Sequence, residues 1–484
     1  MRARIGLEIH VQVTEAGTKL FCGCSADYRG RPPNSNVCPV CLGLPGALPV
    51  VNKRVVELAL RTAIALNCRI PDRIVFTRKH YFYPDLPKNY QISMFERAGG
   101  VPVCLEGFLE YLDPVAWAWR KCGIRRINIE EDPGRTVYDG DIVRSPLSHV
   151  DYNRSGVPLL EIVTEPDLES PRDARVFLEY LLLTLEHLGV TNPRLEGAFR
   201  VDANVSVEGG ERVEVKNIGS VADVEKALVF EIARQTKILE SGGVVARETR
   251  HWDGARGVTI SLRHKEYEEE YLYFPDPDLP PIAITREMLE EARREAEERS
   301  LKTVLSKLSS LGVPRDLAWS LVQVRDSLRV FLESVEAGAD PLLAARILAV
   351  DYRGEVKEAG RDLFDSSSWP PASTIVEIVK LVERGEYPYD TIKGLVLPKL
   401  AQNPRASLKE LLPEKAVDIE AYVEETLRAE RKAVADYLSG KKEALNYLVG
   451  ATIRRIGRRA VDPRLVREAI EKRLKSLGEL STRS

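Results

Sequence analysis

Residues 5–13 read IGLEIHVQV, a strict alternation of apolar and polar positions. Successive side chains of a β-strand point to opposite faces, so this stretch predicts a strand with one apolar and one polar face. Five branched residues, Ile5, Leu7, Ile9, Val11 and Val13, would pack on a core. The polar face would carry Gly6, Glu8, His10 and Gln12.

Two further segments repeat the alternation. Residues 126–130 read RINIE, with two isoleucines on one face and Arg126, Asn128 and Glu130 on the other. Residues 200–216 predict a hairpin around the turn EGGE at 208–211. Its polar positions include Arg200, Asp202, Glu214 and Lys216. If these strands share one sheet, its open face holds Glu8, His10, Glu130 and Glu214 beside Arg200 and Lys216.

These polar faces have two interpretations. Carboxylates and a histidine can hold Mg²⁺ while cations neutralise phosphate oxygens, the combination that phosphoryl transfer needs. The alternative is a generic solvated face, because antiparallel sheets commonly expose one polar side to water. The sequence contains no GxxxxGK[ST] and no GxGxxG. Any nucleotide site is therefore of another type.

Two close cysteine pairs predict a metal site. Cys22 and Cys24 are separated by 13 residues from Cys38 and Cys41. Four thiolates on two tight turns can surround Zn²⁺ tetrahedrally with no open position, so the zinc would be structural. Reduced thiols without a metal are the alternative. The odd total of seven cysteines argues against a disulfide framework. The remaining three, Cys68, Cys104 and Cys122, are predicted to be isolated core residues.

Two loops are rich in residues that bind ligands. Residues 79–88, KHYFYPDLPK, mix cations with aromatic rings between prolines. Such a segment could hold a nucleotide base or a tRNA end by stacking, although aromatic packing over a core edge would explain it equally well. Residues 151–156, DYNRSG, form a polar turn before an apolar strand, and a turn alone would explain them.

The order of patterns predicts an α+β fold followed by helices. Residues 1–291 mix short strands with two long helices. One helix is capped by Ser170 and stops at Gly189, and the other covers 223–240. Strand patterns then fade. We therefore expect a helical domain at 292–410 and a small helical tail domain at 411–484.

Charge is distributed unevenly along the chain. The net charge is −3, yet residues 428–484 carry 15 Lys and Arg against 7 Asp and Glu. A basic tail on an acidic body indicates a polyanionic partner, or else a solvated helix surface. No apolar run approaches the roughly 18 residues of a membrane span. The first ten residues lack the apolar core of a signal peptide, so a cytoplasmic location is expected.

The motifs together resemble one family, the GatB subunits of aspartyl/glutamyl-tRNA amidotransferases. The matching stretches extend over nearly the whole chain. They are IGLEIHVQV, KLFCGC, NVCPVCLGLPGALPVVN, RKHYFYPDLPKNYQIS, VDYNRSGVPLLEIVTEPD, RVDANVSV, VEVKNIGS, RETRHWD, YLYFPDPDLPP and KAVADYLSGKKEALNYLVG. The resemblance implies a cradle-shaped α+β domain with an antiparallel sheet, similar in class to glutamine synthetase and guanido kinases, then a helical domain and a helical tail.

The resemblance also implies the chemistry. ATP and Mg²⁺ would phosphorylate the side-chain carboxylate of mischarged Asp-tRNA(Asn) or Glu-tRNA(Gln), and ammonia would displace the phosphate. An A subunit with amidase activity would supply the ammonia from glutamine, and a small C subunit would hold the heterotrimer together. The basic tail would contact tRNA, with Arg454, Arg455, Arg458 and Arg459 on a helix.

Site residues are carried over by motif. Glu8, His10, Glu130 and Glu214 would organise Mg²⁺ and phosphate, and Arg200 and Lys216 would neutralise developing phosphate charge. Cofactor binding would further involve Lys79, Tyr81, Asp202 and Asp151. Zinc would be held by Cys22, Cys24, Cys38 and Cys41. Family members often have histidine at the position of Asn128, which is left out of the site. The competing hypotheses are a zinc-stabilised RNA-binding adaptor without an active site, and a carboxylate–amine ligase acting on small molecules.

Overall fold

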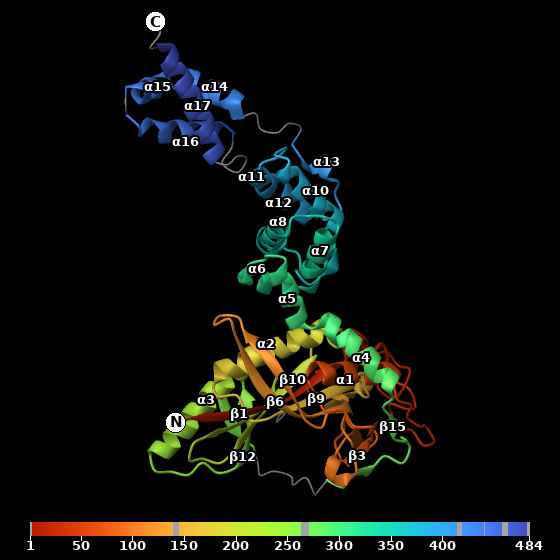
Figure 1. Ribbon diagram of the computed structural model, residues 1–484. Coiled ribbons are helices and arrows are strands. Elements are labelled where there is room, and N and C mark those ends of the chain that lie inside the picture. Colours follow the sequence, from red (N-terminus) through yellow and green to blue (C-terminus); the bar gives the residue numbers. More distant parts are fainter. Residues whose placement is uncertain are drawn as a thin grey trace. The chain divides into compact units, whose positions relative to one another are not determined.

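The computed structural model describes residues 2–138, 145–262, 271–413, 419–439, 441–456 and 463–481. The chain divides into two compact units, Met1–Thr303 and Val304–Ser484 (Figure 1). The first mixes strands and helices, and the second is helical in its described residues. This confirms the predicted α+β class.

An eight-stranded sheet forms the centre of the first unit. Its order is β13-β12-β11-β10-β1-β9-β6-β5. All neighbouring strands are antiparallel except β11 and β12, which are parallel. The sheet is therefore mixed, whereas a fully antiparallel sheet was predicted. The helix between these two strands makes the parallel crossover possible. The strands are β1 (Ala3–Gln12), β5 (Gly107–Asp113), β6 (Ala118–Glu131), β9 (Pro158–Thr164), β10 (Phe199–Val207), β11 (Val213–Ile218), β12 (Glu248–Asp253) and β13 (Val258–Ser261).

The apolar face of the sheet is the core. Ile5, Ile9 and Val11 of β1 are fully buried, as the alternation predicted. Helices α1 (Lys53–Ala65), α2 (Pro171–His187) and α3 (Val221–Glu240) lie along the sheet (Figure 1). The Ser170 side chain caps α2 by accepting from the Asp173 backbone N–H, as predicted. The equivalent cap of α3 is Ser220, so this helix begins two residues earlier than expected.

The described residues also form three small sheets. Strands β14 (Phe274–Pro275), β3 (Thr77–His80) and β4 (Tyr90–Ser93) form the first. The others pair β2 (Arg73–Ile74) with β15 (Ile282–Ala283), and β7 (Arg135–Tyr138) with β8 (Ser148–Asp151). Short 3₁₀ turns occur at η1 (Thr14–Ala16), η2 (Glu96–Ala98) and η3 (Tyr152–Arg154).

Helix α4 (Arg286–Arg299) belongs to the first compact unit, which extends to Thr303, and the expected domain boundary at 291/292 stays a prediction. Its charged composition suggested the helical domain, but Ala292 and Ala296 are buried. The buried guanidinium of Arg61 on α1 forms an ion pair with Glu295. These contacts attach α4 to α1.

Cys68 and Cys104 form a disulfide, which corrects the expectation that both are isolated thiols. The segments around them run side by side. The Arg69 backbone N–H donates to the Glu106 carbonyl, and the Leu105 backbone N–H donates to the Arg69 carbonyl. Cys122 is a buried free thiol, as predicted.

The second unit is built from helices. They are α5 (Leu301–Ser310), which begins at the boundary, α6 (Arg315–Val322), α7 (Arg325–Glu336), α8 (Pro341–Arg346), α9 (Tyr352–Glu358), α10 (Ala372–Glu383), α11 (Tyr389–Thr391), α12 (Leu397–Gln402), α13 (Leu408–Leu411), α14 (Ile419–Ala429), α15 (Arg431–Leu438), α16 (Ala444–Ile456) and α17 (Pro463–Ser481). The described part of this unit also contains two π-helical turns, η5 (Ile347–Asp351) and η7 (Ile392–Val396), and the 3₁₀ turn η6 (Ser366–Ser368).

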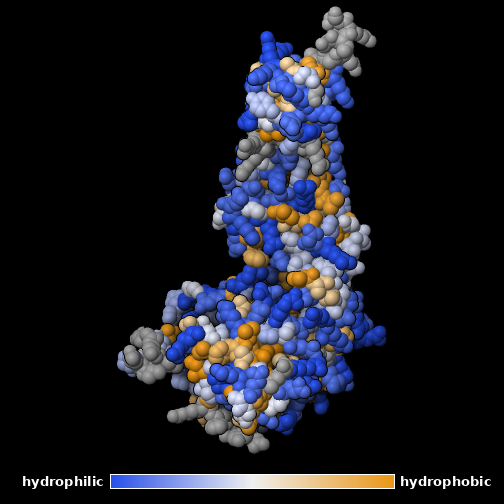
Figure 2. Space-filling model, turned by 90° about the vertical axis from the view of Figure 1, so that its left-hand side faces the viewer, coloured by the Kyte–Doolittle hydropathy of each residue, from blue (hydrophilic) through white to orange (hydrophobic). Residues whose placement is uncertain are grey.

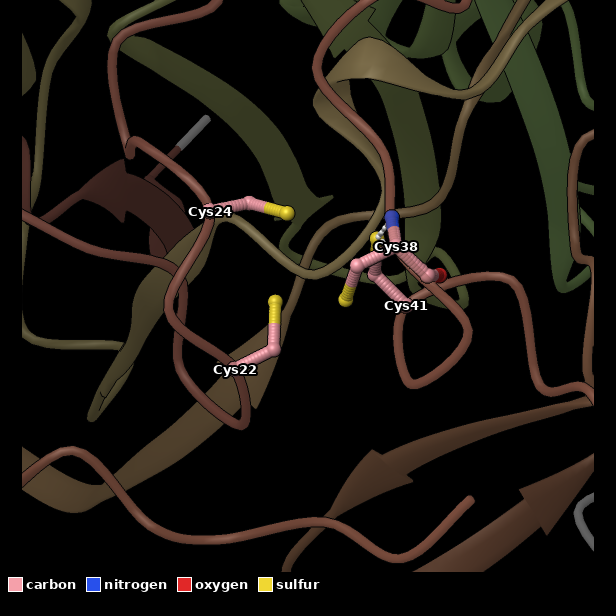
Figure 3. Close-up of side chains that lie close together, drawn as sticks. All are labelled: Cys22, Cys24, Cys38 and Cys41. Carbon is pink, nitrogen blue, oxygen red and sulfur yellow. Dashed lines mark hydrogen bonds between the residues drawn. The ribbon is translucent and has the colours of Figure 1, made fainter. Parts of the chain in front are cut away.

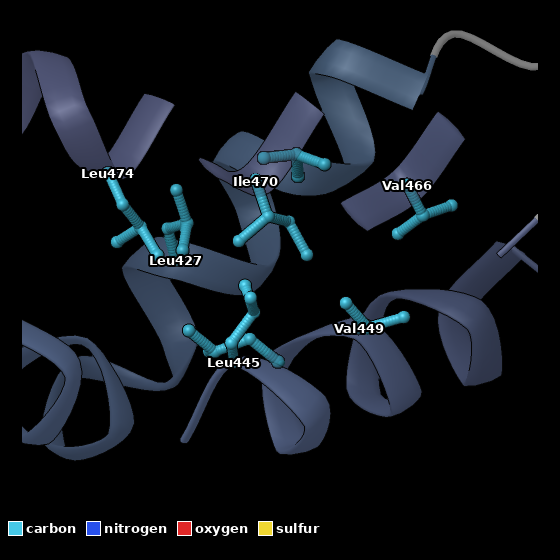
Figure 4. Packing of buried hydrophobic residues seen from close by; sticks show 8 residues of the cluster. Leu427, Leu445, Val449, Val466, Ile470 and Leu474 are labelled. Carbon is cyan, nitrogen blue, oxygen red and sulfur yellow. The ribbon is translucent and has the colours of Figure 1, made fainter. Parts of the chain in front are cut away.

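The last helices share a hydrophobic cluster. Leu427, Leu445, Val449, Val466, Ile470 and Leu474 point toward one another from α14, α16 and α17 (Figure 4). The structure groups this region with the preceding helices, so the predicted separation at 410/411 stays a prediction.

The surface is largely hydrophilic, but apolar side chains gather in a patch on the face of the first unit seen in Figure 2. Within the described ranges, no helix has both the length and the apolar character needed to cross a bilayer.

Candidate active site

Four polar residues form a row across four neighbouring strands of the large sheet. Asn128 of β6 lies opposite Glu161 of β9, which lies opposite His10 of β1, and His10 lies opposite Arg200 of β10. Directly opposite residues share a face, so these side chains stand side by side. The alternation seen in sequence therefore becomes one polar surface.

A second group lies beside this row. Glu8 is opposite Asp202. The Lys216 ammonium lies 3.4 Å from a carboxylate oxygen of Asp202 and 3.4 Å from one of Glu214. The Asn217 backbone N–H also donates to Asp202 at 2.8 Å. The predicted residues of β1, β6, β10 and β11 thus share one face. We call this set the sheet-face site: Glu8, His10, Glu130, Glu161, Arg200, Asp202, Glu214 and Lys216.

Glu161 is the site residue that the sequence analysis missed. Glu8, His10 and Glu161 each offer a ligand atom, and these atoms all lie within 4.8 Å of one another. The segment PLLEIVT at 158–164 reads as a buried apolar strand. A single acid inside such a strand was the available signal, since a buried carboxylate needs a partner.

Glu130 is held by the small sheet. The Ser93 hydroxyl of β4 donates to Oε1 of Glu130. The Gln91 amide donates to Oε2 at 3.5 Å and to the Glu131 carbonyl at 2.7 Å. Strand β4 therefore fixes the end of β6, and with it a carboxylate of the site.

Burial dominates the electrostatics of the site. It raises the pKa of Glu8 to about 8, and repulsion from Glu161 and Asp202 adds to the shift. Burial also raises the pKa of Glu130 and that of Glu161. For His10, burial and the nearby Arg200 charge lower the pKa, which favours the neutral ring.

These groups fit a cation. Burial disfavours the ionised form of these carboxylates, and a bound cation would stabilise it. Neutral imidazole is the form that ligates metals. Nδ1 of His10 is buried and has no hydrogen-bond partner among the described residues. The site thus has an uncommitted donor atom as well as an acidic ligand set.

Lys79 and Tyr81 stand beside the site in an aromatic cluster. The Lys79 ammonium lies 4.9 Å from the ring centroid of Tyr271 and 5.8 Å from that of Tyr81. The rings of Tyr81 and Tyr83 meet edge to face at 5.7 Å. The Lys79 charge acts to lower the pKa of Glu130 against the effect of burial. The predicted segment 79–88 therefore borders the sheet-face site.

Asp151 has a different neighbourhood from the other predicted residues. Its Oδ1 accepts from the backbone N–H of Asn34 at 2.9 Å and of Asn153 at 3.0 Å. It caps a turn and anchors the loop that follows the first cysteine pair. A direct part in ligand binding stays a prediction.

The four predicted cysteines converge. The sulfur atoms of Cys22, Cys24, Cys38 and Cys41 point toward a common centre (Figure 3), and all lie within 4.8 Å of one another. The Cys38 backbone N–H donates to Cys41 Sγ at 3.1 Å. The fully buried Lys19 places its ammonium 3.5 Å from the same sulfur. Four sulfur ligands without a carboxylate or open position suit a structural tetrahedral metal.

Two of the four arginines of the predicted basic helix lie among the described residues. Arg454 and Arg455 lie in the last turn of α16. Arg455 pairs with Glu430 at 3.5 Å, and the Arg454 guanidinium lies 6.0 Å from the ring centroid of Tyr447. Arg458 and Arg459 lie outside the described residues.

Comparison with known proteins gives a consistent picture. Residues 3–290 match the GatB/GatE catalytic domain family, and residues 329–474 match the GatB domain family. The GatB subunit of the aspartyl/glutamyl-tRNA(Asn/Gln) amidotransferase of Aeropyrum pernix is 61% identical over 476 residues, 98% of each chain. The corresponding subunits of the same enzyme from Saccharolobus solfataricus and Carboxydothermus hydrogenoformans are 44% and 39% identical, over 97% and 98% of this chain and 99% of each relative. With the motifs, the sheet-face site and both domain families in agreement, this chain belongs to the GatB family.

Proposed function

We propose that this chain is the kinase and tRNA-binding subunit of a tRNA-dependent amidotransferase, a glutamine-dependent ligase that forms a carbon–nitrogen bond. It would amidate Asp on tRNA(Asn), Glu on tRNA(Gln), or both. The observation that carries the proposal is the in-register row of His10, Glu161 and Arg200 beside Glu8 in a GatB chain. The first unit would be a cradle of the glutamine synthetase and guanido kinase class.

The reaction needs an activated carboxylate. Ammonia cannot displace oxide from a carboxylate, so the γ-phosphoryl group of ATP is first transferred to a side-chain oxygen, releasing ADP. Ammonia then forms the new C–N bond, and inorganic phosphate leaves with the bonding electrons and that oxygen. Each step brings several negative charges together. A site that combines acidic metal ligands with fixed cations suits this requirement.

The chain's own residues divide this work by position. Glu8, His10 and Glu161 would hold Mg²⁺, with Glu130 and Glu214 as further ligands or as acceptors for its water. When bound, the ion would neutralise phosphate oxygens and orient them. Arg200 and Lys216 are cations at the edge of this acidic group and would contact the transferring phosphoryl group. Lys79 and the Tyr81 ring would bind the nucleotide or the tRNA end beside it.

The four-cysteine cluster would hold Zn²⁺ and have a structural role. It closes the loop 25–37, which contacts the turn at Asp151 and Asn153. The metal would therefore stabilise this loop and the turn that it contacts, while the chemistry would occur on the sheet face.

Partners follow from the proposed reaction. Ammonia would come from an A subunit with glutaminase activity, held with this chain by a small C subunit. The exposed apolar patch of Figure 2 is consistent with a subunit that works in a complex. The basic residues of the tail, including Arg454 and Arg467, would contact tRNA phosphates.

The test is ATP turnover by the reconstituted complex with ammonium chloride as nitrogen source. Turnover should require mischarged tRNA and should be lost with Glu8→Ala. Whichever of Asp-tRNA(Asn) and Glu-tRNA(Gln) supports it identifies the substrate. Turnover without tRNA would favour a ligase for small molecules, and tRNA binding without any ATP turnover would favour an adaptor. Either result would overturn the proposal.

A further inference from the structure

We infer that Asp132 is a positioning residue for Arg200 and that a chain of hydrogen bonds connects it to the loop between the two cysteine pairs. Asp132 directly follows β6 and is 3% exposed. Its Oδ1 lies 3.4 Å from Nη1 of Arg200. Its Oδ2 accepts from the Gln12 amide at 2.8 Å. Each carboxylate oxygen therefore contacts a different partner.

The backbone holds Asp132 in place. Its N–H donates to the Val157 carbonyl at 2.8 Å, and its own carbonyl accepts from Gly156 at 2.9 Å. A second cation, Arg154, has its Nε 4.0 Å from Oδ2 of Asp132. The Arg154 guanidinium also donates to the backbone carbonyls of Pro133 and Gly134. The carboxylate is thus a fixed anchor toward which Arg200 must orient.

Gln12 extends the connection to the cysteine loop. It is 1% exposed, and its Oε1 accepts from Nη2 of Arg29 at 2.6 Å. Its amide nitrogen also lies 3.3 Å from the hydroxyl of Tyr28. Arg29 is held in turn by the Glu196 carbonyl at 2.9 Å and lies 4.8 Å from the Tyr28 ring centroid. Tyr28 and Arg29 lie in the loop 25–37, which runs between Cys24 and Cys38.

The contact with Asp132 would determine which way the Arg200 guanidinium points. Arg200 is surrounded by acids, and Asp202 and Glu130 also attract its charge. A guanidinium free to turn would pair with these acids and leave the phosphate position. Asp132 follows the end of β6, two positions beyond Glu130, and its partner Gln12 lies two positions beyond His10 on β1. Holding one edge of the guanidinium leaves the remaining N–H groups for substrate, since the group has five donors.

The role of Asp132 rests on the proposed function, because it requires Arg200 to meet a phosphate. The test uses the reconstituted complex with ammonium chloride and mischarged tRNA. We expect Asp132→Asn to lower kcat by about 10- to 100-fold, the cost of a misplaced catalytic group, with the KM for aminoacyl-tRNA unchanged. Asp113→Asn is the matched control. Asp113 is also buried and binds two arginines, Arg172 and Arg120, but outside the sheet-face site.

A double-mutant cycle separates positioning from simple loss of stability. If Asp132 acts through Arg200, the double variant Asp132→Asn, Arg200→Ala should have the same kcat as Arg200→Ala alone. The inference would be overturned if the fold-losses in kcat of the two single variants multiplied in the double variant. It would also be overturned if Asp132→Asn kept the wild-type kcat. If Arg200→Ala itself keeps full activity, the proposed function has placed the phosphate site wrongly, which is a distinguishable failure.

Arg29 provides a second variant that leaves the buried carboxylate intact. Arg29→Ala should lower kcat by several-fold in the wild-type background, about 3- to 10-fold, and by nothing further in Asp132→Asn. Equal losses in both backgrounds would show that Arg29 acts elsewhere. If Arg29→Ala alone left kcat unchanged, the loop between the cysteine pairs would have no part in positioning Arg200.

Discussion

The side-chain amide of Asn128 donates a hydrogen bond to Oε2 of Glu161 at 2.5 Å, so a residue of β6 orients a carboxylate of β9 that faces His10. Arg126 lies 3.7 Å from the other oxygen. In metal sites, hydrogen-bond partners that orient a ligating side chain tune the affinity of the site for the ion. The relationship identifies Glu161 as an organised part of the site.

Glu161→Gln should therefore abolish the response of ATP turnover to Mg²⁺, or shift half-saturation upward by at least about tenfold. The substitution keeps the size of the side chain and removes its charge. A Mg²⁺ titration of tRNA-dependent turnover measures the effect. Glu165→Gln is the control, because Glu165 follows the same strand but forms an exposed pair with Arg125. Equal Mg²⁺ dependence in both variants would exclude Glu161 as a ligand.

Removing one sulfur should empty the cysteine site. Cys38→Ser is expected to reduce bound zinc from about one ion per chain to near zero, because four thiolates complete the tetrahedron. Elemental analysis of the purified protein measures this. Cys122→Ala removes a buried thiol outside the cluster and should keep the zinc. Zinc retained by Cys38→Ser would show that the four sulfurs do not form the metal site.

The Cys68–Cys104 disulfide should stabilise the first unit against unfolding. It joins cysteines 36 positions apart, and closing a loop of this size stabilises a protein by about 3–4 kcal/mol, mainly by restricting the unfolded chain. Denaturant unfolding should show this loss in the double variant Cys68→Ala, Cys104→Ala. A reductant should destabilise the wild type and leave the variant unchanged. Wild-type protein indifferent to reductant would contradict the disulfide.

Removal of the residues after about 415 should raise the KM for aminoacyl-tRNA and leave ammonia-dependent chemistry partly intact. The tail contributes basic residues such as Arg454, and its helices α14, α16 and α17 share a hydrophobic cluster. Phosphate contacts release counterions, so the intact complex should also lose affinity steeply as salt rises. Kinetics at several salt concentrations measure both effects. An unchanged KM in the truncated protein would refute a tRNA-binding tail.

The sequence predicted the parts of the site that lie on strands with strict alternation. Glu8 and His10 occupy every second position of a strand whose other face is the core, and period two determines their common face. The same argument placed Arg200, Asp202, Glu214 and Lys216. It could not give the order of strands, which places Glu161 between Asn128 and His10.

Other features depend on contacts between distant segments. Glu161 is a single acid in a strand that reads as apolar, and only the pairing of strands shows that it lies beside His10 and Asn128. The disulfide depends on pairing between the segments around Arg69 and Glu106. Helix α4 resembles a solvated helix by composition, yet the buried Arg61 attaches it to the first unit through Glu295. Local patterns do not contain such pairings.

The most direct test of the central claim follows one oxygen atom. Mischarged tRNA would carry Asp or Glu labelled with ¹⁸O in its side-chain carboxylate, and phosphate released by the reconstituted complex would be analysed by mass spectrometry. Transfer of the γ-phosphoryl group to the carboxylate predicts ¹⁸O in the phosphate with the wild-type chain and none with Glu8→Ala. Amide formation with unlabelled phosphate, or labelled phosphate from Glu8→Ala at the wild-type rate, would contradict a kinase on this sheet face.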